Sequence, residues 1–417
     1  MKAMKHPRFA ARSLVWSAVL AAAMASLSFA QEQRPGWWNG AWPYRKLVEV
    51  PAGGAGVYQA RVFTGNRGAP DGADLRLVSP NGAPVSLRVV HSAGGLHLIA
   101  FEDPSPKRSG GTFALYYGNS SARAPAVTGP RKGLVLRTRP VSSDADVSSW
   151  KAAEAALGTG PDFGAGFQPQ VFDATNPFGP VENYAAIYEG FLDCPGSGEY
   201  RFATVSDGAS FLFVNDKLVA EWPGRQHNIN LGRRGERSGT ITLDEGTHDF
   251  RYVAFSFDHP SRVVAAWQPP GKSRVELIPP AAFGRIGDAT IRSGESLGRS
   301  AHADFAFTPA AYLEVGSAQM VAVRFESHSS CRTGRILSAE WEFGDGTTDT
   351  GLNVTHVYLL PGTYSIALKV KTTGGAEQSW TTDALIVPLW TDADFQTPKK
   401  IARFLDAVRK YSPAEMP

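Results

Sequence analysis

The sequence predicts an all-β protein of three tandem β-sandwich domains followed by a short C-terminal helix. Short apolar or alternating runs recur about every ten residues and end at Gly, Pro, Asp or Asn, which is typical of sandwiches. The 417 residues include 43 Gly and 29 Pro, enough to supply many turns. This length suits two to four domains.

Residues 1–30 predict a secretory signal peptide. Four basic residues precede an apolar run over 13–27, and Ser28-Phe29-Ala30 has the pattern of a cleavage site. The apolar run is shorter than the ~20 residues that a membrane span needs. We therefore expect a secreted protein, extracellular, on the cell surface or in the periplasm, with no membrane span after signal cleavage.

The net charge bears on the expected partners, and the cysteine content bears on disulfide bonds. Cleavage removes four positive charges and lowers the formal net charge from +3 to −1, so nucleic acid is not an expected partner. Cys194 and Cys331 are the two cysteines. They fall in different predicted domains, so we expect two separate thiols and no disulfide.

Residues 31–130 predict an N-terminal sandwich, with strands expected at 57–63, 75–78, 85–90, 96–101 and 113–117. Its Trp37, Trp38 and Trp42 suit either a sugar-stacking platform or, as the favoured interpretation, buried packing. The motifs W-P-Y-R (42–45), P-D-G-A-D-L-R-L-V (70–78) and L-Y-Y-G-N (115–119) resemble a domain of unknown function at the front of secreted bacterial proteins. That resemblance implies a jelly-roll-like sandwich.

Residues 131–166 predict a linker with a strand at 134–136 and a helix at 147–157, where four Ala favour helix. The glycines of 158–166 end this pattern.

Residues 167–283 predict a central sandwich, with a two-residue hairpin turn at Asn215-Asp216. Four segments carry a resemblance: G-F-L-D-C-P-G-S-G-E-Y-R-F, S-D-G-A-S-F-L-F-V-N-D-K-L-V, I-T-L-D-E-G-T-H-D-F and A-W-Q-P-P-G. They resemble the lectin-like sandwich first named for the anthrax protective antigen.

The resemblance implies a ligand site. Sugar-binding members of that family hold calcium through two adjacent Asp residues, and the calcium holds sugar hydroxyls. Here Asp207 matches the first Asp, Gly208 replaces the second, and Asn215 aligns with a later ligand. The candidate metal ligands are thus Asp207 and Asn215, with Trp222 added for ligand binding. The lost carboxylate weakens a calcium site, and the alternative is that no cofactor binds and Asp207 caps a turn.

Residues 284–300 predict a Gly/Ser/Arg-rich linker. The linker contains a G-x-S-x-G match at 294–298, but a nucleophile elbow needs a preceding strand and a following helix. The sequence predicts neither, so we interpret the match as chance.

Residues 301–388 predict a third, immunoglobulin-like sandwich. W-x-F-G-D-G followed by H-x-Y and P-G-x-Y resembles a PKD (polycystic kidney disease) repeat. Trp341 and Phe343 are expected to fill the core, Gly346 to take a positive φ, and Tyr364 to bond backbone at a corner. The structural signature is Trp341, Phe343, Gly344, Asp345, Gly346, His356, Tyr358 and Tyr364. Residues 389–417 predict a tail whose Ile401, Phe404, Leu405 and Val408 share one helical face.

No catalytic constellation emerges from the sequence. The leading hypothesis is a non-enzymatic extracellular or cell-surface binding and spacer protein, whose partner is a glycan, through the central domain, or another extracellular protein. The alternatives are a structural envelope or scaffold protein, and an accessory part of a secreted glycoside hydrolase or protease.

Overall fold

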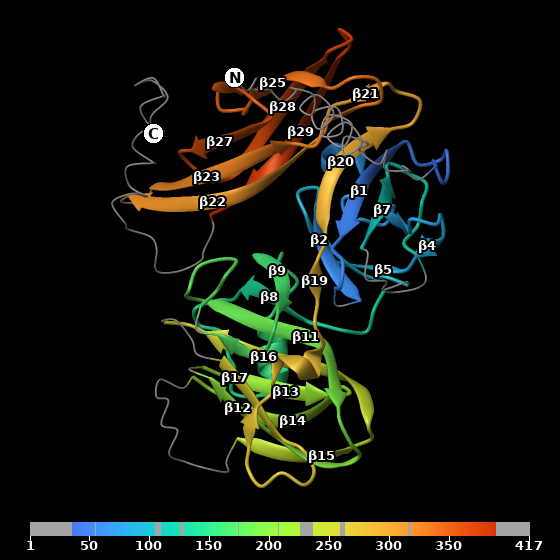
Figure 1. Cartoon of the computed structure of the whole chain (residues 1–417). Helices are drawn as coiled ribbons and strands as arrows, with labels where there is room; N and C mark the ends of the chain where they lie inside the picture. Colours follow the sequence, from blue (N-terminus) through green and yellow to red (C-terminus); the bar gives the residue numbers. More distant parts are fainter. Residues whose placement is uncertain are drawn as a thin grey trace, which may run out of the picture.

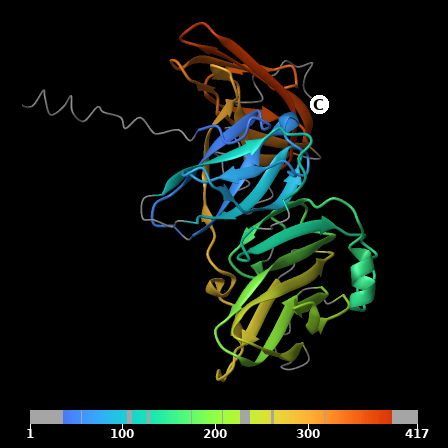
Figure 2. The same cartoon turned by 90° about the vertical axis from the view of Figure 1, so that its right-hand side faces the viewer.

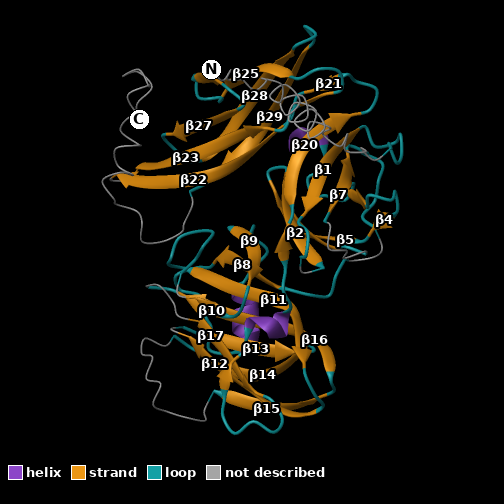
Figure 3. Ribbon diagram, viewed as in Figure 1, coloured by secondary structure: helices purple, strands orange, loops and turns teal. Residues whose placement is uncertain are grey.

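A computed structural model describes residues 36–54, 56–104, 110–125, 129–173, 175–206, 208–225, 237–258, 263–315 and 318–388. The predicted signal peptide, Asp207 and the predicted C-terminal helix lie outside the described residues. The described chain forms three β-sandwiches, which confirms the all-β prediction (Figures 1 and 3).

The N-terminal sandwich packs two sheets. One has the order β20-β1-β7-β3-β4 and the other β19-β2-β6-β5. Its elements are β1 (Tyr44–Val50), β2 (Val57–Phe63), η1 (Gly65–Arg67), β3 (Arg76–Val78), β4 (Pro84–Val85), β5 (Leu87–Ala93), β6 (Leu96–Glu102), β7 (Gly111–Tyr117), β19 (Gly287–Asp288) and β20 (Thr290–Ser296). Alternate apolar residues such as Val48, Leu77, Ile99 and Phe113 face inward and form one core.

The central sandwich packs β14-β13-β16-β11-β8-β9 against β10-β17-β12-β15, with β18 added beside β17. Its elements are β8 (Leu134–Pro140), α2 (Trp150–Ala156), β9 (Gly164–Gln168), β10 (Phe172–Asp173), β11 (Tyr184–Cys194), β12 (Gly198–Ser206), β13 (Ser210–Val214), β14 (Lys217–Trp222), β15 (Ser238–Leu243), β16 (Gly246–Ser256), β17 (Val263–Gln268), β18 (Glu276–Leu277) and η2 (Pro280–Phe283). Helix α2 confirms the helix prediction and covers the outer face of the first sheet, where Trp150 meets Phe211 and Phe213 (Figure 2).

The C-terminal sandwich packs β22-β23-β27 against β26-β25-β28-β29, with a small β21-β24 ladder beside them. Its elements are β21 (Ala301–His302), β22 (Phe305–Val315), β23 (Ala318–Ser327), β24 (Ser330–Cys331), β25 (Ile336–Glu342), β26 (Thr348–Thr350), β27 (Asn353–Tyr358), β28 (Gly362–Thr372) and β29 (Glu377–Ile386). Trp341 and Phe343 fill its core as predicted, and Cys194 and Cys331 are both free thiols.

The prediction of a linker at 284–300 is wrong, because this segment contains two paired strands. Strand β20 pairs along β1 from Tyr44↔Ser296 to Glu49↔Thr290, and β19 pairs with β2. Both strands therefore complete the N-terminal sandwich. The sequence hid them because β20 is an edge strand whose inner face carries little more than Ile291, so no apolar alternation shows.

The linker predicted at 131–166 also belongs to a domain. Strand β8 pairs with β11 and β9 pairs with β8, so both extend the central sheet. Gly164 and Gly166, which suggested a break, lie in strand β9. Glycine suits these two positions because the ring of Phe178 occupies the space where a side chain would stand.

These two corrections change the domain order. The chain leaves the N-terminal sandwich after β7, builds the whole central sandwich, and returns as β19 and β20 (Figure 1). The amide of Gly133 donates to the carbonyl of Phe283 at 2.7 Å, so the two ends of the central domain lie side by side. The central sandwich is therefore an insertion in the N-terminal one, a position that folded domains tolerate when their termini are close.

Candidate functional site

Of the predicted calcium turn, the structure describes the two flanking residues, Ser206 and Gly208. Ser206 on one side of the turn donates from Oγ to the carbonyl of Gly208 at 2.7 Å. A Cβ at Gly208 would lie 2.0 Å from the carbonyl oxygen of Phe255, so the backbone there has no room for a second Asp. Asp207 itself lies outside the described residues, and its role as a ligand stays a prediction.

Asn215 does not reach this turn. It occupies the hairpin after β13 with Asp216, at φ of 50° and 59°, as predicted for a two-residue turn. The five residues of β13 separate it from the turn, a span of roughly 17 Å. Its amide is used in the hairpin: Oδ1 accepts from the Asp249 amide at 3.1 Å and Nδ2 contacts His248 Nδ1 at 3.0 Å.

Trp222 lies nearer the turn, opposite Ser210 in the β13–β14 ladder. Its side chain is buried, with 6% exposure, so it offers no open face to a sugar ring. The structure therefore does not bring Asn215 and Trp222 together as a ligand site. Among the described residues, no group of three or more His, Cys, Asp or Glu side chains could hold a metal ion.

The N-terminal tryptophans are half-buried and lie ahead of β1, outside the core of the sandwich, so they match the buried-packing interpretation only in part. Trp37, Trp38 and Trp42 pack around Tyr116 on the outer face of the first sheet. The indole nitrogen of Trp42 donates to the carbonyl of Asp74 at 2.7 Å, and that of Trp37 donates to the carbonyl of Trp42 at 3.0 Å. These bonds fix the rings against the domain.

A cleft of about 450 Å³ lies where the three sandwiches meet, and we call it the junction cleft. The N-terminal sandwich contributes residues from β2, β19 and β20, the central sandwich from β9 and the loop after β10, and the C-terminal sandwich from β23 and the turn after it. Its lining residues are Gln59, Ala60, Arg61, Gly166, Phe167, Gln168, Pro177, Phe178, Asp288, Ala289, Thr290, Ile291, Glu326 and His328.

The central sandwich supplies the aromatic wall of the junction cleft. Phe178 lies on a loop that the buried Asn176 holds closed: Asn176 Nδ2 donates to the Pro180 carbonyl at 2.8 Å, and Oδ1 accepts from Thr138 Oγ1 at 2.7 Å. Gly166 leaves the room that the ring of Phe178 fills.

The N-terminal sandwich supplies the polar wall. Gln59 Nε2 donates to Asp288 Oδ1 at 2.9 Å, so the amide and the carboxylate stand together at the edge of the cleft. Arg61 donates to the carbonyl of Ala165 in the central sandwich at 3.3 Å. Burial lowers the pKa of Arg61, whose guanidinium lies between the two domains.

The C-terminal sandwich closes the third side with Glu326 and His328. Burial, with a smaller contribution from the positive charge of Lys46, lowers the pKa of His328 to about 3, so its ring is neutral at physiological pH. Its Nδ1 is buried and has no hydrogen-bond partner among the described residues. With Arg61 as the one cation and Asp288 and Glu326 as two anions, the lining residues suit a neutral polar ligand better than an anion.

The sequence alone does not indicate this site. Gln59, Arg61 and Asp288 carry no motif, and Asp288 fell within the predicted linker. Strands β2, β9 and β23 come together only because the central sandwich is inserted in the N-terminal one. A sequence pattern within one domain cannot indicate such a contact between domains.

Two family models match the chain. A PKD domain model matches residues 309–387 and a PA14 domain model matches residues 172–279. The chain therefore contains a PKD domain and a PA14 domain, which confirms both resemblances. No helix of the described residues is long and apolar enough to cross a membrane.

Curated relatives share only a short segment. Collagenase ColA of Bacillus cereus (strain ATCC 14579) and collagenase ColQ1 of Bacillus cereus (strain Q1) are each 45% identical over 56 residues. That segment covers 13% of this chain and 6% of the length of these curated relatives.

Solved structures resemble single domains. The PKD1 domain of Vibrio anguillarum Epp is 20% identical and covers 22% of this chain and 96% of its own, with a TM-score of 0.19. The PA14 domain of the MpAFP antifreeze protein is 12% identical and covers 39% and 97%, with a TM-score of 0.32. A PA14 sugar-binding domain from an RTX adhesin is 14% identical and covers 37% and 99%, with a TM-score of 0.30.

Proposed function

We propose that this chain is a secreted, non-enzymatic carbohydrate-binding protein that holds a short saccharide in the junction cleft. The observation that carries the proposal is the pairing of an aromatic wall from the central sandwich with a polar wall from β2 and β19. Sites for small molecules favour domain interfaces and volumes of about 300–1,000 Å³, and the 450 Å³ of the junction cleft fits that range.

The chemistry of the lining residues selects the ligand class. A pyranose ring has apolar C–H faces that pack on aromatic rings, here Phe167 and Phe178, and hydroxyl groups around its rim. The carboxylates of Asp288 and Glu326 can accept hydrogen bonds from such hydroxyls, and the amide of Gln168 can accept or donate one. The nearly balanced charge of the lining residues favours a neutral sugar over a sulfated or phosphorylated one.

A glycan array tests the proposal, using the mature chain with and without a calcium chelator. Gln168 has an amide in the cleft and Gln378 has one on β29, away from it, so Gln168→Ala and Gln378→Ala form a matched pair. Loss of the hydrogen bonds of Gln168 should weaken binding about tenfold, equal to 1.4 kcal/mol, whereas Gln378→Ala should bind normally.

Two outcomes contradict the proposal in different ways. Binding that needs calcium and ignores Gln168→Ala would assign the sugar to the turn at 206–208 instead of the cleft. If the array shows no glycan bound under either condition, carbohydrate binding itself is excluded.

The similarity to collagenases favours a second candidate, in which the chain is an accessory arm of a secreted hydrolase. Its 56-residue matching segment is a small part of those enzymes, so this candidate gives the chain a binding role and leaves catalysis to another part of the enzyme. Sedimentation with insoluble collagen, compared with cellulose and chitin, tests this candidate. Enrichment on collagen alone would favour it over the saccharide proposal.

A further inference from the structure

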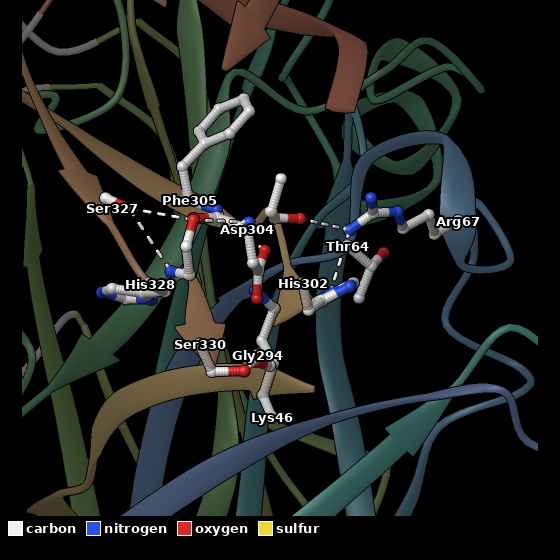
Figure 4. A network of polar contacts seen from close by, with 12 residues as sticks. Lys46, Thr64, Arg67, Gly294, His302, Asp304, Phe305, Ser327, His328 and Ser330 are labelled. Atoms are coloured by element: carbon white, nitrogen blue, oxygen red, sulfur yellow. Dashed lines mark hydrogen bonds and ion pairs between the residues drawn. The ribbon is translucent and has the colours of Figure 1, made fainter. Parts of the chain in front are cut away.

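Lys46 and Asp304 meet in the interior between the N-terminal and C-terminal sandwiches. Lys46 Nζ lies 2.5 Å from Asp304 Oδ2, and the two side chains are 1% and 0% exposed (Figure 4). Charge-assisted N–H···O contacts are usually about 2.7–2.9 Å. The two groups are therefore in direct contact and shielded from bulk solvent.

The surroundings favour the uncharged forms of both groups. Burial raises the pKa of Asp304 and lowers that of Lys46, against the attraction between the two side chains. An ion pair in such an interior bears a large desolvation cost. In their uncharged forms the two groups are an amine with a free lone pair and a carboxylic acid, which are the two reactants of an amide bond.

Gly294 makes this contact sterically feasible. It stands opposite Lys46 in the β1–β20 ladder, and a Cβ at this position would lie 1.7 Å from Asp304 Oδ2. The carboxyl group therefore occupies the space of the missing side chain. Backbone bonds fix the approach, since Gly294 donates to the His328 carbonyl and His328 donates to the Asp304 carbonyl, each at 2.8 Å.

The other carboxyl oxygen is polarised. The amide of Phe305 donates to Asp304 Oδ1 at 2.9 Å. The Arg67 guanidinium donates to the neighbouring Ala303 carbonyl at 2.9 Å, which brings a positive charge close to the same group. Donors fixed where negative charge develops lower the barrier of acyl transfer.

We propose that Lys46 and Asp304 join in an intramolecular isopeptide bond. The Lys46 Nζ lone pair attacks Asp304 Cγ, and the oxyanion forms on Oδ1 against the Phe305 amide. The Cγ–Oδ2 bond then breaks, and Oδ2, which already carries the acid proton, takes one amine proton and leaves as water. The Nζ–Oδ2 contact is the path of that proton. The reaction needs no oxidant or cofactor, and burial of the site limits the access of water for the reverse hydrolysis.

The bond would join residues 258 positions apart in the sequence. The first strand of the N-terminal sandwich would be covalently tied to the start of β22, so a pull on the C-terminal sandwich could not detach it from the N-terminal one. A protein that works outside the cell, exposed to shear and proteases, gains mechanical resistance from such a link.

Intact-mass spectrometry of the mature chain tests the proposal. The protein is first folded and is denatured only for the mass measurement. The expected mass is lower than the sequence mass by one water, and peptide mapping should find the segments around Lys46 and Asp304 joined. A full sequence mass after prolonged incubation of the folded protein would overturn the proposal.

Variants secure the assignment. Lys46→Met keeps the length of the side chain but removes the nucleophile, and should show the full sequence mass, whereas Lys371→Met, at an exposed ion pair on β28, should still lack one water. Because Lys46→Met could fail to fold, Asp304→Asn adds a second measurement. If this variant joins, it loses ammonia in place of water and reaches the same final mass as the joined wild type. A water loss that persists in folded Lys46→Met, confirmed by circular dichroism, would show that the bond lies elsewhere.

Discussion

At the scale of residues, the signature of the C-terminal sandwich is one contact cluster. The ring of Phe343 stacks on His356 with centroids 4.0 Å apart, and His356 Nε2 lies 2.7 Å from Asp345 Oδ2. Tyr358 donates from its hydroxyl to the Phe343 carbonyl at 3.1 Å, and Tyr364 donates to the Leu360 carbonyl at 2.8 Å, which is the predicted corner bond. The residues of the PKD signature therefore stabilise the packing of two strands and a turn against each other.

Trp341→Ala should cost about 3–5 kcal/mol of unfolding free energy, because it empties a large buried volume. Trp341 is 1% exposed, packs against Phe305 and Phe325, and donates from Nε1 to the Gly351 carbonyl at 2.8 Å. Urea unfolding followed by circular dichroism measures the loss. Leu337→Ala on the same strand, 61% exposed, is the control and should change little. Equal stabilities for the two variants would contradict the placement of Trp341.

Asp345 should make the C-terminal sandwich sensitive to acid. Burial alone raises the pKa of its carboxyl, but hydrogen bonds from His356 and Thr347 outweigh burial and lower the pKa to about 2. A pKa below the ordinary 3.8 means that the ionised form stabilises the fold. That stabilisation is complete above pH 3.8 and is lost as the pH falls through about 2.

Asp345→Asn tests this dependence. The variant should unfold more easily than the wild type near pH 6, and the difference should shrink between pH 4 and pH 2 in urea titrations. Asp383→Asn, at an exposed position on β29, serves as control and should not share this trend. A difference that stays constant down to pH 2 would show that the Asp345 charge is not the cause.

At the scale of elements, the sequence predicted strands that carry their own apolar alternation and missed those that depend on neighbours. Strands β2, β6 and β7, helix α2 and the Asn215-Asp216 hairpin follow from local patterns. Strand β20 could not be predicted, because its place is set by pairing with β1, some 250 positions away. The junction cleft escaped for the same reason. The amide of Asn215, a predicted ligand, contacts Asp249 and His248 of β16 in the hairpin, which the sequence did not indicate.

Gly190→Ala should destabilise the central sandwich by about 1–3 kcal/mol, the usual cost of an overpacked core. Gly190 pairs with Leu134 where β8 joins β11, and a Cβ there would lie 2.3 Å from the Gly133 carbonyl oxygen. Backbone cannot move aside as a side-chain end can. Gly196→Ala, with open space around it in the next turn, is the control, and thermal unfolding compares the two. Similar melting temperatures would mean that β8 does not pack closely on β11.

At the scale of the whole molecule, the three sandwiches interlock instead of forming a string of independent domains. The central sandwich interrupts the N-terminal one, and the N-terminal sandwich reaches into the C-terminal core through Phe63 and Leu96. Asn66 ties the same interface, since its amide nitrogen donates to the Thr381 carbonyl and its Oδ1 accepts from Trp380 Nε1, each at 3.0 Å. This arrangement places residues of all three sandwiches around the junction cleft.

Phe63→Ala should therefore destabilise the C-terminal sandwich, although Phe63 lies on β2 of the N-terminal sandwich. The ring of Phe63 lies 4.9 Å from that of Phe307 and 5.6 Å from that of Trp380, between centroids, and its loss should cost about 3–5 kcal/mol. Hydrogen exchange locates the damage: amides of β28 and β29 should lose protection, while those of β11 in the central sandwich should not. Phe101→Ala removes an equal ring from the N-terminal core alone and should spare β29. If both variants leave β29 equally protected, the C-terminal sandwich folds without its neighbour, and the interlocked body is contradicted.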